Sequence, residues 1–152
     1  IWVIVNGGAD EEIAQAIYVK RNAGCGMYGG VYDPVTVAVP QVDGTTFDVV
    51  FSRPDPEPLW ISFDATAITG SIDEDYIRNQ ILERLSYGIN EKADASAIVC
   101  LVKSIAPNAS ISAEGVSLDN LAYSSLLAPT NVDNQFIIAS ERIIINSNPG
   151  PS

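Results

Sequence analysis

The chain has 152 residues, of which 47% are hydrophobic and 18% are charged, so it can build a hydrophobic core and differs from an intrinsically disordered protein. Its formal net charge is −11 with only 8 lysine and arginine residues, which argues against binding to nucleic acid or to an anionic membrane surface. No apolar run reaches the roughly 18 residues of a membrane-spanning helix.

Residues 1–5 are apolar and mostly β-branched, which predicts a buried strand rather than a signal peptide. The first residue is not Met, so we expect the chain to be a portion of a longer protein. Gly7 and Gly8 allow a sharp turn after the strand. Asp10 is expected to cap a helix that ends by Gly24.

This strand, glycine turn and helix resemble the start of a phosphate-binding loop. The segment lacks the glycine and lysine spacing of such loops, however. Asp10, Glu11 and Glu12 would also lie where a phosphate binds and would repel it. We therefore predict no nucleotide site and no cofactor.

Residues 35–67 alternate between polar and apolar side chains with a period of two. This pattern predicts antiparallel strands with one solvated face. Asp43 and Gly44 predict a hairpin turn within it. Segment 53–58 contains three prolines, which cannot donate hydrogen bonds to a sheet, so we predict a stiff connector there.

A helix is predicted after Ser71, which is expected to be its N-cap. Apolar residues repeat along this helix every four positions, at Ile77, Ile81, Leu85 and Ile89. The acidic residues 73–75 match the dipole of its first turn, and this explanation is preferred to a cation site, so we predict no metal. A second, shorter helix is predicted over 94–106, with Asp94 or Ser96 as its cap and Pro107 after its end.

Short strands are predicted for the rest of the chain, at 111–118 and 121–127. Residues 136–139 and 143–145 are expected to form a final pair around Ser140 and Glu141. Residues 147–152 are expected to be a polar tail. The predicted fold class is α+β in two small subdomains, 1–54 and 59–152, each a short antiparallel sheet packed with one or two helices.

The chain contains no histidine, which excludes a Ser-His-Asp or Cys-His catalytic centre. Cys25 and Cys100 lack metal-binding spacing, and two free thiols are favoured over a disulfide between them. A hydrolase would have to use paired carboxylates, for example Asp64 with Asp73 or Glu74. Nothing in the sequence singles out such a pair, so we predict that the chain is not an enzyme.

The order and spacing of several landmarks resemble the baseplate J-like family of contractile phage tails. The resembling residues are Val3-Ile4-Val5-Asn6-Gly7-Gly8, Ile13-Ala14-Gln15-Ala16-Ile17, Ala23-Gly24 to Tyr28-Gly29, Val42-Asp43-Gly44, Phe51-Ser52-Arg53-Pro54, and Asp73 to Ile89 with Gly88. The resemblance covers most of residues 1–106 and is weaker beyond them. The N-terminal region usual in the family is absent.

The resemblance implies a structural subunit of the baseplate wedge, which assembles around the tail tube and passes the contraction signal to the sheath. The chain would be the C-terminal portion of such a subunit, in a virion tail baseplate assembled in the host cytoplasm. Its expected partners are other baseplate and tail proteins, within an oligomer, and it would need no cofactor. The same implication extends to prophages and other phage-derived contractile injection systems.

The interface is expected to use the glycine loop 23–30, with Met27 and Tyr28 exposed, or the outer face of a helix, and burial of Met27 or Tyr28 in the core is the competing interpretation. The candidate interface residues are Met27, Tyr28, Tyr32 and Trp60, because tyrosine, tryptophan and methionine side chains are enriched at interfaces. The alternative function is a tail-associated carbohydrate- or receptor-binding module. In that case Trp60, Tyr28, Tyr32 and Tyr123 would stack on a sugar beside Asp and Asn side chains. Packing of Trp60 inside the domain, or against a neighbouring one, is the competing interpretation.

Overall fold

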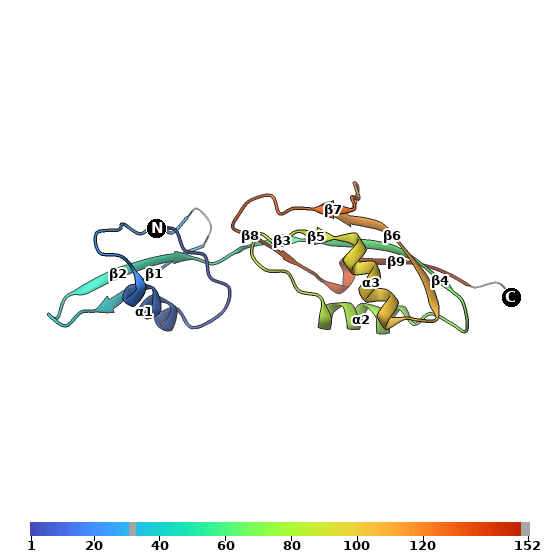
Figure 1. The fold of residues 1–152 in the computed structure, drawn as a ribbon, viewed down its shortest axis with the longest axis horizontal. Helices are drawn as coiled ribbons and strands as arrows, with labels where there is room; N and C mark the ends of the chain where they lie inside the picture. The colour runs from blue at the N-terminus through green and yellow to red at the C-terminus, as the bar shows by residue number, and fades with distance from the viewer. Residues whose placement is uncertain (31–32, 150–152) are drawn as a thin grey trace. The chain divides into compact units, whose positions relative to one another are not determined.

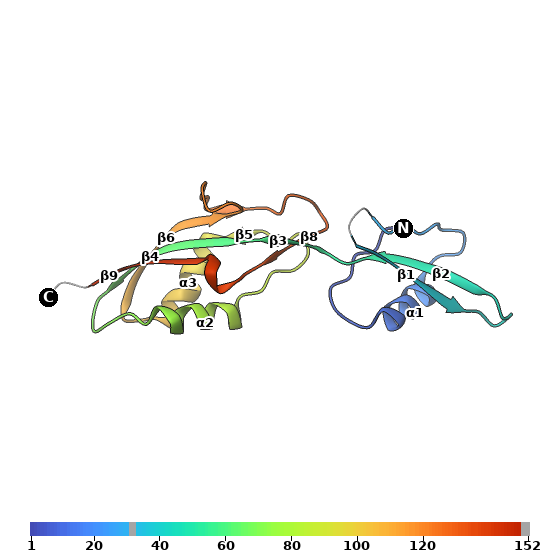
Figure 2. The same cartoon turned by 180° about the vertical axis from the view of Figure 1, so that it is seen from behind.

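The structure is a computed structural model and describes residues 1–30 and 33–149 (Figures 1 and 2). The chain divides into two units, Ile1–Asp55 and Pro56–Ser152, with the boundary inside the proline-rich segment. Helices and strands occur in both units, which confirms the predicted α+β class.

The first unit packs one helix, α1 (Asp10–Lys20), against a hairpin of β1 (Pro34–Pro40) and β2 (Thr46–Ser52) (Figure 1). The strands pair antiparallel, as predicted. The turn between them forms because the Asp43 carboxylate accepts hydrogen bonds from the amide and hydroxyl of Thr45, while Gly44 takes a φ of 83°. The buried core of this unit consists of Ala14, Val39, Val49 and Phe51.

Residues 1–5 do not form the continuous buried strand that the sequence predicts. They make two isolated parallel bridges, Trp2 with Tyr28 and Ile4 with Ser52. Ile1 is 50% exposed and Trp2 is 41% exposed. The prediction is wrong because each bridge pairs a single residue rather than a run of residues, and only Val3 and Val5 of this segment pack against the core.

The helix α1 begins differently from the prediction and ends as expected. Its N-cap is Ala9, with no side-chain cap, and Asp10 instead pairs with Arg53. The last helical residue is Lys20, which lies before Gly24. The missing cap is explained by Arg53, because its guanidinium binds the carboxylate that would otherwise accept from the helix amides.

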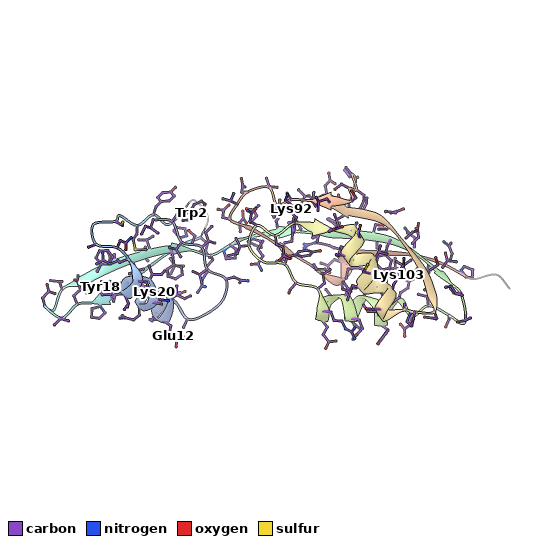
Figure 3. The ribbon with its side chains drawn as sticks, in the orientation of Figure 1. Trp2, Glu12, Tyr18, Lys20, Lys92 and Lys103 are labelled. Atoms are coloured by element: carbon purple, nitrogen blue, oxygen red, sulfur yellow. The ribbon has the colours of Figure 1, made fainter. Side chains whose placement is uncertain are left out.

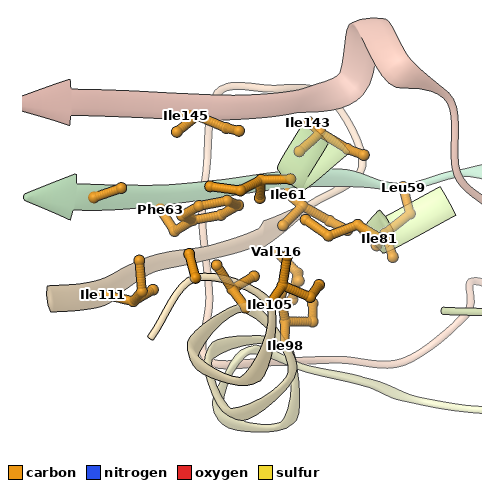
Figure 4. Packing of buried hydrophobic residues seen from close by; sticks show 14 of the residues in the cluster. Leu59, Ile61, Phe63, Ile81, Ile98, Ile105, Ile111, Val116, Ile143 and Ile145 are labelled. Atoms are coloured by element: carbon orange, nitrogen blue, oxygen red, sulfur yellow. The ribbon is translucent and has the colours of Figure 1, made fainter. Parts of the chain in front are cut away.

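The second unit is built on a three-stranded sheet with the order β6 (Ala109–Ser117), β4 (Trp60–Ala67), β9 (Ile143–Asn148). β4 pairs antiparallel with β6 and parallel with β9, so the sheet is mixed rather than purely antiparallel. One face of the sheet carries the helices α2 (Glu74–Arg84) and α3 (Ala95–Ile105). In Figure 4, Ile61 and Phe63 of β4 lie between the buried isoleucines of β9 and those of β6 and α3.

Two short pairings complete this unit. β3 (Asp55–Pro58) pairs with β8 (Asn134–Ile137), and β5 (Ala93–Asp94) pairs antiparallel with β7 (Leu126–Leu127). The predicted connector 53–58 is therefore wrong over its last four residues. Proline lacks a donor but keeps its carbonyl acceptor, so a proline-rich strand can still lie at an edge.

The last predicted strand pair is also wrong. β8 and β9 do not pair with each other, because the 3-10 helix η1 (Ser140–Arg142) lies between them and each joins a different sheet. β9 extends to Asn148, so the first residues of the predicted polar tail belong to a strand. The strand predicted at 121–127 is reduced to Leu126–Leu127.

The helix boundaries of this unit were predicted in part. α3 begins after Asp94, whose carboxylate accepts from the amide of Ser96 at 2.8 Å, and this confirms one of the two predicted caps. The N-cap of α2 is Asp73 and not Ser71, because Asp73 accepts from the amide of Tyr76 at 2.9 Å. α2 ends at Arg84, so the apolar repeat runs past the helix into the segment that follows it.

Candidate assembly surface

Arg53 holds the glycine turn that precedes α1. Its guanidinium donates to the carbonyl oxygens of Val5 at 3.1 Å, Gly7 at 2.7 Å and Gly8 at 2.9 Å, and it contacts the Asp10 carboxylate at 2.5 Å. Both glycines take positive φ angles, 72° and 81°. Three carbonyl oxygens face a cation here, which is the reverse of a phosphate loop, where amide groups face an anion.

An aromatic pair lies at the surface of the first unit. The Trp2 and Tyr28 rings meet edge to face, with centroids 6.3 Å apart and an interplanar angle of 73°. Tyr28 is 57% exposed and Trp2 is 41% exposed. Their backbones are joined by a parallel bridge, so both rings are carried by paired segments. We call these two rings the Trp2–Tyr28 surface (Figure 3 labels Trp2).

Gly30, in the glycine cluster after α1, allows the Trp2 ring to pack closely against the backbone. Gly30 has a φ of 69°, and a Cβ atom there would lie 2.7 Å from Trp2 Nε1 and 2.9 Å from Ser52 Oγ. The Ser52 hydroxyl donates to the carbonyl oxygen of Gly29, and Trp2 Nε1 donates to Ser52 Oγ at 3.4 Å. Glycine is therefore required at position 30 for the indole to lie against the backbone.

The four predicted interface residues lie in different environments. Tyr28 is on the surface, as expected for an interface residue. Met27 is half-buried and packs against the core of the first unit. Tyr32 lies outside the described residues. Trp60 is half-buried in β4 of the second unit.

Sequence reasoning missed Trp2, because it assigned the whole segment 1–5 to a buried strand. The alternation of side chains along residues 1–5 could have identified Trp2 as a surface residue. Val3 and Val5 pack against the core, so Trp2 between Ile1 and Val3 falls on the opposite side.

The described residues proposed for a sugar site are divided between the two units. Tyr28 belongs to the first unit, whereas Trp60 and Tyr123 belong to the second. Trp60 alternates with buried Ile61, so it shares with Asp64 the β4 face that lies away from the helices. The Asp64 carboxylate accepts hydrogen bonds from Ser112 Oγ at 3.4 Å and Asn146 Nδ2 at 3.2 Å.

The carboxylates considered for a hydrolase have structural partners. Asp73 caps α2. Glu74 accepts a hydrogen bond from Ser147 Oγ at 2.6 Å and pairs with Arg78 at 2.8 Å, and these contacts lower the pKa of Glu74, the Ser147 bond most strongly. A general acid needs a raised pKa at neutral pH, so the shift at Glu74 has the wrong sign for that role.

Within residues 1–30 and 33–149, no group of three or more His, Cys, Asp or Glu side chains is arranged to hold a metal ion. No helix in this described part of the chain is long and apolar enough to cross a membrane. Cys25 and Cys100 are both free thiols.

The chain matches no protein-family model and no curated protein. The resemblance to the baseplate J-like family therefore stays a prediction. It rests on the order of the landmarks in the sequence.

Proposed function

We propose that the chain belongs to a structural subunit of a contractile-tail baseplate, that it takes part in wedge assembly, and that it is not an enzyme. The observation that supports this proposal is the Arg53 contact. The resemblance includes a glycine turn near residue 7 and an Arg-Pro pair at residues 53 and 54, and one guanidinium joins them. Two separate landmarks of the resemblance thus belong to one structural device in this chain.

The Trp2–Tyr28 surface is the part of the first unit best suited to bind another baseplate protein. Tryptophan and tyrosine are the side chains most often found among the dominant residues of protein interfaces. Here the Trp2 ring is held before binding by Gly30 and Ser52, and the Tyr28 ring packs edge to face against it. Binding therefore costs little side-chain entropy.

Labelling of assembled particles tests the proposal. An epitope inserted in the β1–β2 turn, where Val42 is fully exposed, provides a binding site for gold-conjugated antibody. The expected result in electron microscopy is label at the distal end of the tail. Particles without label, in a preparation where a known baseplate protein is labelled, would contradict the structural role.

The docking surface is tested by incorporation of variants into the same particles. We expect Trp2→Ala combined with Tyr28→Ala to lower incorporation by about tenfold or more, because each ring at such a site contributes over ~1 kcal/mol. Tyr76→Ala is the matched control, since Tyr76 is 51% exposed on α2 of the second unit and lies outside the proposed surface. Equal incorporation of both variants would remove the Trp2–Tyr28 surface from the proposal.

Carbohydrate binding is the second candidate function, favoured by the position of Trp60 and Asp64 on the same face of β4. A glycan array separates the two candidates. Binding of one glycan class by the wild-type chain, lost in Trp60→Ala and kept in Tyr76→Ala, would support the binding module. Absence of any glycan signal would leave the structural role as the remaining candidate.

A further inference from the structure

The outer face of α1 carries a groove that the interface described above does not use. One depression of about 290 Å³ is lined by Ile1, Val3, Ala16, Ile17, Lys20 and Arg21. A second adjoins it and shares Ala16 and Lys20 with the first. Ala16 is exposed at the floor of both, and Val19 beside it is 70% exposed. A small residue flanked by apolar ones permits close approach of another helix.

Charges of opposite sign lie at the two ends of this face. Glu12 is in the first turn of α1 and Lys20 is in the last turn, about 12 Å apart along the helix axis (Figure 3). Neither belongs to an ion pair among the described residues. Ala16 lies midway between them in the sequence. The face is therefore self-complementary about Ala16 under a two-fold rotation.

We propose that a second copy of this chain docks on this groove, with the two α1 helices antiparallel and Ala16 of one copy against Ala16 of the other. In this arrangement each Glu12 faces Lys20 of the second copy, so two equivalent ion pairs form. A parallel arrangement would place Glu12 against Glu12 and Lys20 against Lys20. The charge pattern thus selects the antiparallel arrangement.

A single helix-to-helix contact is smaller than the roughly 1,200 Å² typical of stable complexes. The net charge of −11 on each copy also opposes self-association. The contact is therefore weak between separate chains and gains strength where an assembly holds the copies close together. The proposal does not depend on the baseplate role, because its test requires only the purified full chain.

Disulfide trapping detects such a weak contact. Ala16→Cys is made in a chain where Cys25 and Cys100, both free thiols, are replaced by serine. Facing small residues at a helix crossing bring their Cα atoms into the range of about 4.4–6.8 Å that a disulfide needs. The control is the Cys25→Ser chain, which keeps exposed Cys100 on α3 as its one thiol. We expect the Ala16→Cys chain to form covalent dimers about tenfold faster than the control.

Charge exchange tests the orientation. In the Ala16→Cys chain, Glu12→Lys places lysine against Lys20 of the second copy, and we expect dimer formation to slow about fivefold. Adding Lys20→Glu restores complementary pairs and the original rate, while far-UV circular dichroism confirms that every variant is folded. A dimerisation rate no greater than that of the Cys100 control would overturn the proposal. Failure of the double exchange to restore the rate would do so as well.

Discussion

Arg53 supplies hydrogen-bond donors to backbone groups that no strand satisfies. The three carbonyl oxygens around Gly7 and Gly8 belong to a turn, so they have no ladder partners, and one side chain binds them all. The Arg53 side chain is 21% exposed and the Asp10 side chain is 45% exposed. The contacts to the carbonyl groups are therefore expected to matter more than the ion pair, which solvent screens.

Arg53→Met is expected to lower the free energy of unfolding of the first unit by about 1–2 kcal/mol, because charged hydrogen bonds to three carbonyl groups are lost. Asp10→Asn keeps these bonds and is expected to cost less than about 0.5 kcal/mol. Urea unfolding followed by Trp2 fluorescence in a Trp60→Phe chain measures both, since each unit contains one tryptophan. Equal losses in the two variants would mean that the ion pair is the dominant contact.

Gly115 occupies a position that no other residue type fits. Its φ is 142°, it lies beside the register shift between β4 and β6, and an added Cβ would lie 2.6 Å from the Ser124 carbonyl oxygen. Gly115→Ala is expected to cost about 3 kcal/mol, since both strain and a backbone clash oppose it.

Gly70→Ala is the matched control for this substitution, because Gly70 has a φ of 72° but no neighbour within 4 Å of the added Cβ. It is expected to cost about 1 kcal/mol from backbone strain alone. Trp60 fluorescence in a Trp2→Phe chain reports both values. A cost for Gly115→Ala no larger than that of Gly70→Ala would mean that the segment at Ser124 moves aside freely.

At the scale of elements, α2 and β9 are linked by side chains as well as by packing. Glu74 accepts from Ser147 Oγ, and Arg78 Nε donates to the carbonyl oxygen of Ile143 at 3.3 Å. The start of a helix thereby holds both ends of the last strand. One of these links depends on the ionised form of a carboxyl group, so it changes with pH.

The Glu74 link is expected to weaken in acid. Its pKa in the folded chain is lowered below the ordinary value of 4.5, chiefly by the Ser147 bond and also by Arg78. Its contribution to stability is therefore complete above pH 4.5 and is lost as the pH falls through the lower, folded pKa. The difference in Tm between wild type and Glu74→Gln is expected to shrink over that range, and Ser147→Ala should behave in the same way. A constant difference down to pH 3 would contradict the assignment.

Local signals in the sequence predicted those elements whose geometry depends on neighbouring residues in the chain. The Asp43-Gly44 turn specified its hairpin, and Asp94 followed by an apolar repeat specified α3. Pairing between distant strands could not be predicted in this way. The apolar character of residues 143–145 fits any buried strand, and nothing local indicates that its partner is β4 rather than the nearer β8.

The candidate surface, like the fold, could be predicted only in part. Tyr28 is exposed, as predicted, and its interface role stays a prediction. Its neighbour Trp2 lies in an apolar run that was assigned to a buried strand. Met27 and Trp60 are of residue types that are enriched at interfaces. The exposure of each side chain depends, however, on the neighbours that the tertiary fold places around it. Sequence patterns do not contain that information for short segments.

For the whole molecule, the two units have cores of very different size. Among the described residues, the core of the first unit consists of 4 buried residues, whereas that of the second contains 18. A small unit buries a smaller fraction of its surface and is less stable on its own. The exposed apolar side chains of the first unit, among them Ile1, Trp2 and Val19, are consistent with this difference.

The first unit is therefore expected to melt at a lower temperature than the second. Thermal unfolding followed by Trp2 in a Trp60→Phe chain and by Trp60 in a Trp2→Phe chain reports the two units separately. Calorimetry of the wild-type chain should show two overlapping transitions. Coincident midpoints from both reporters would show that the units unfold as one.

The parallel pairing of β4 with β9 has a consequence for synthesis on the ribosome. Asp64 and its cross-strand neighbour Asn146 are separated by 82 positions, so β4 emerges long before the strand that pairs with it. Until then the nascent chain carries an unpaired strand edge beside Ile61 and Phe63, a feature that promotes aggregation. Emergence of Ile143 and Ile145 from the ribosome ends that exposure, and a stop codon before Ile143 makes it permanent.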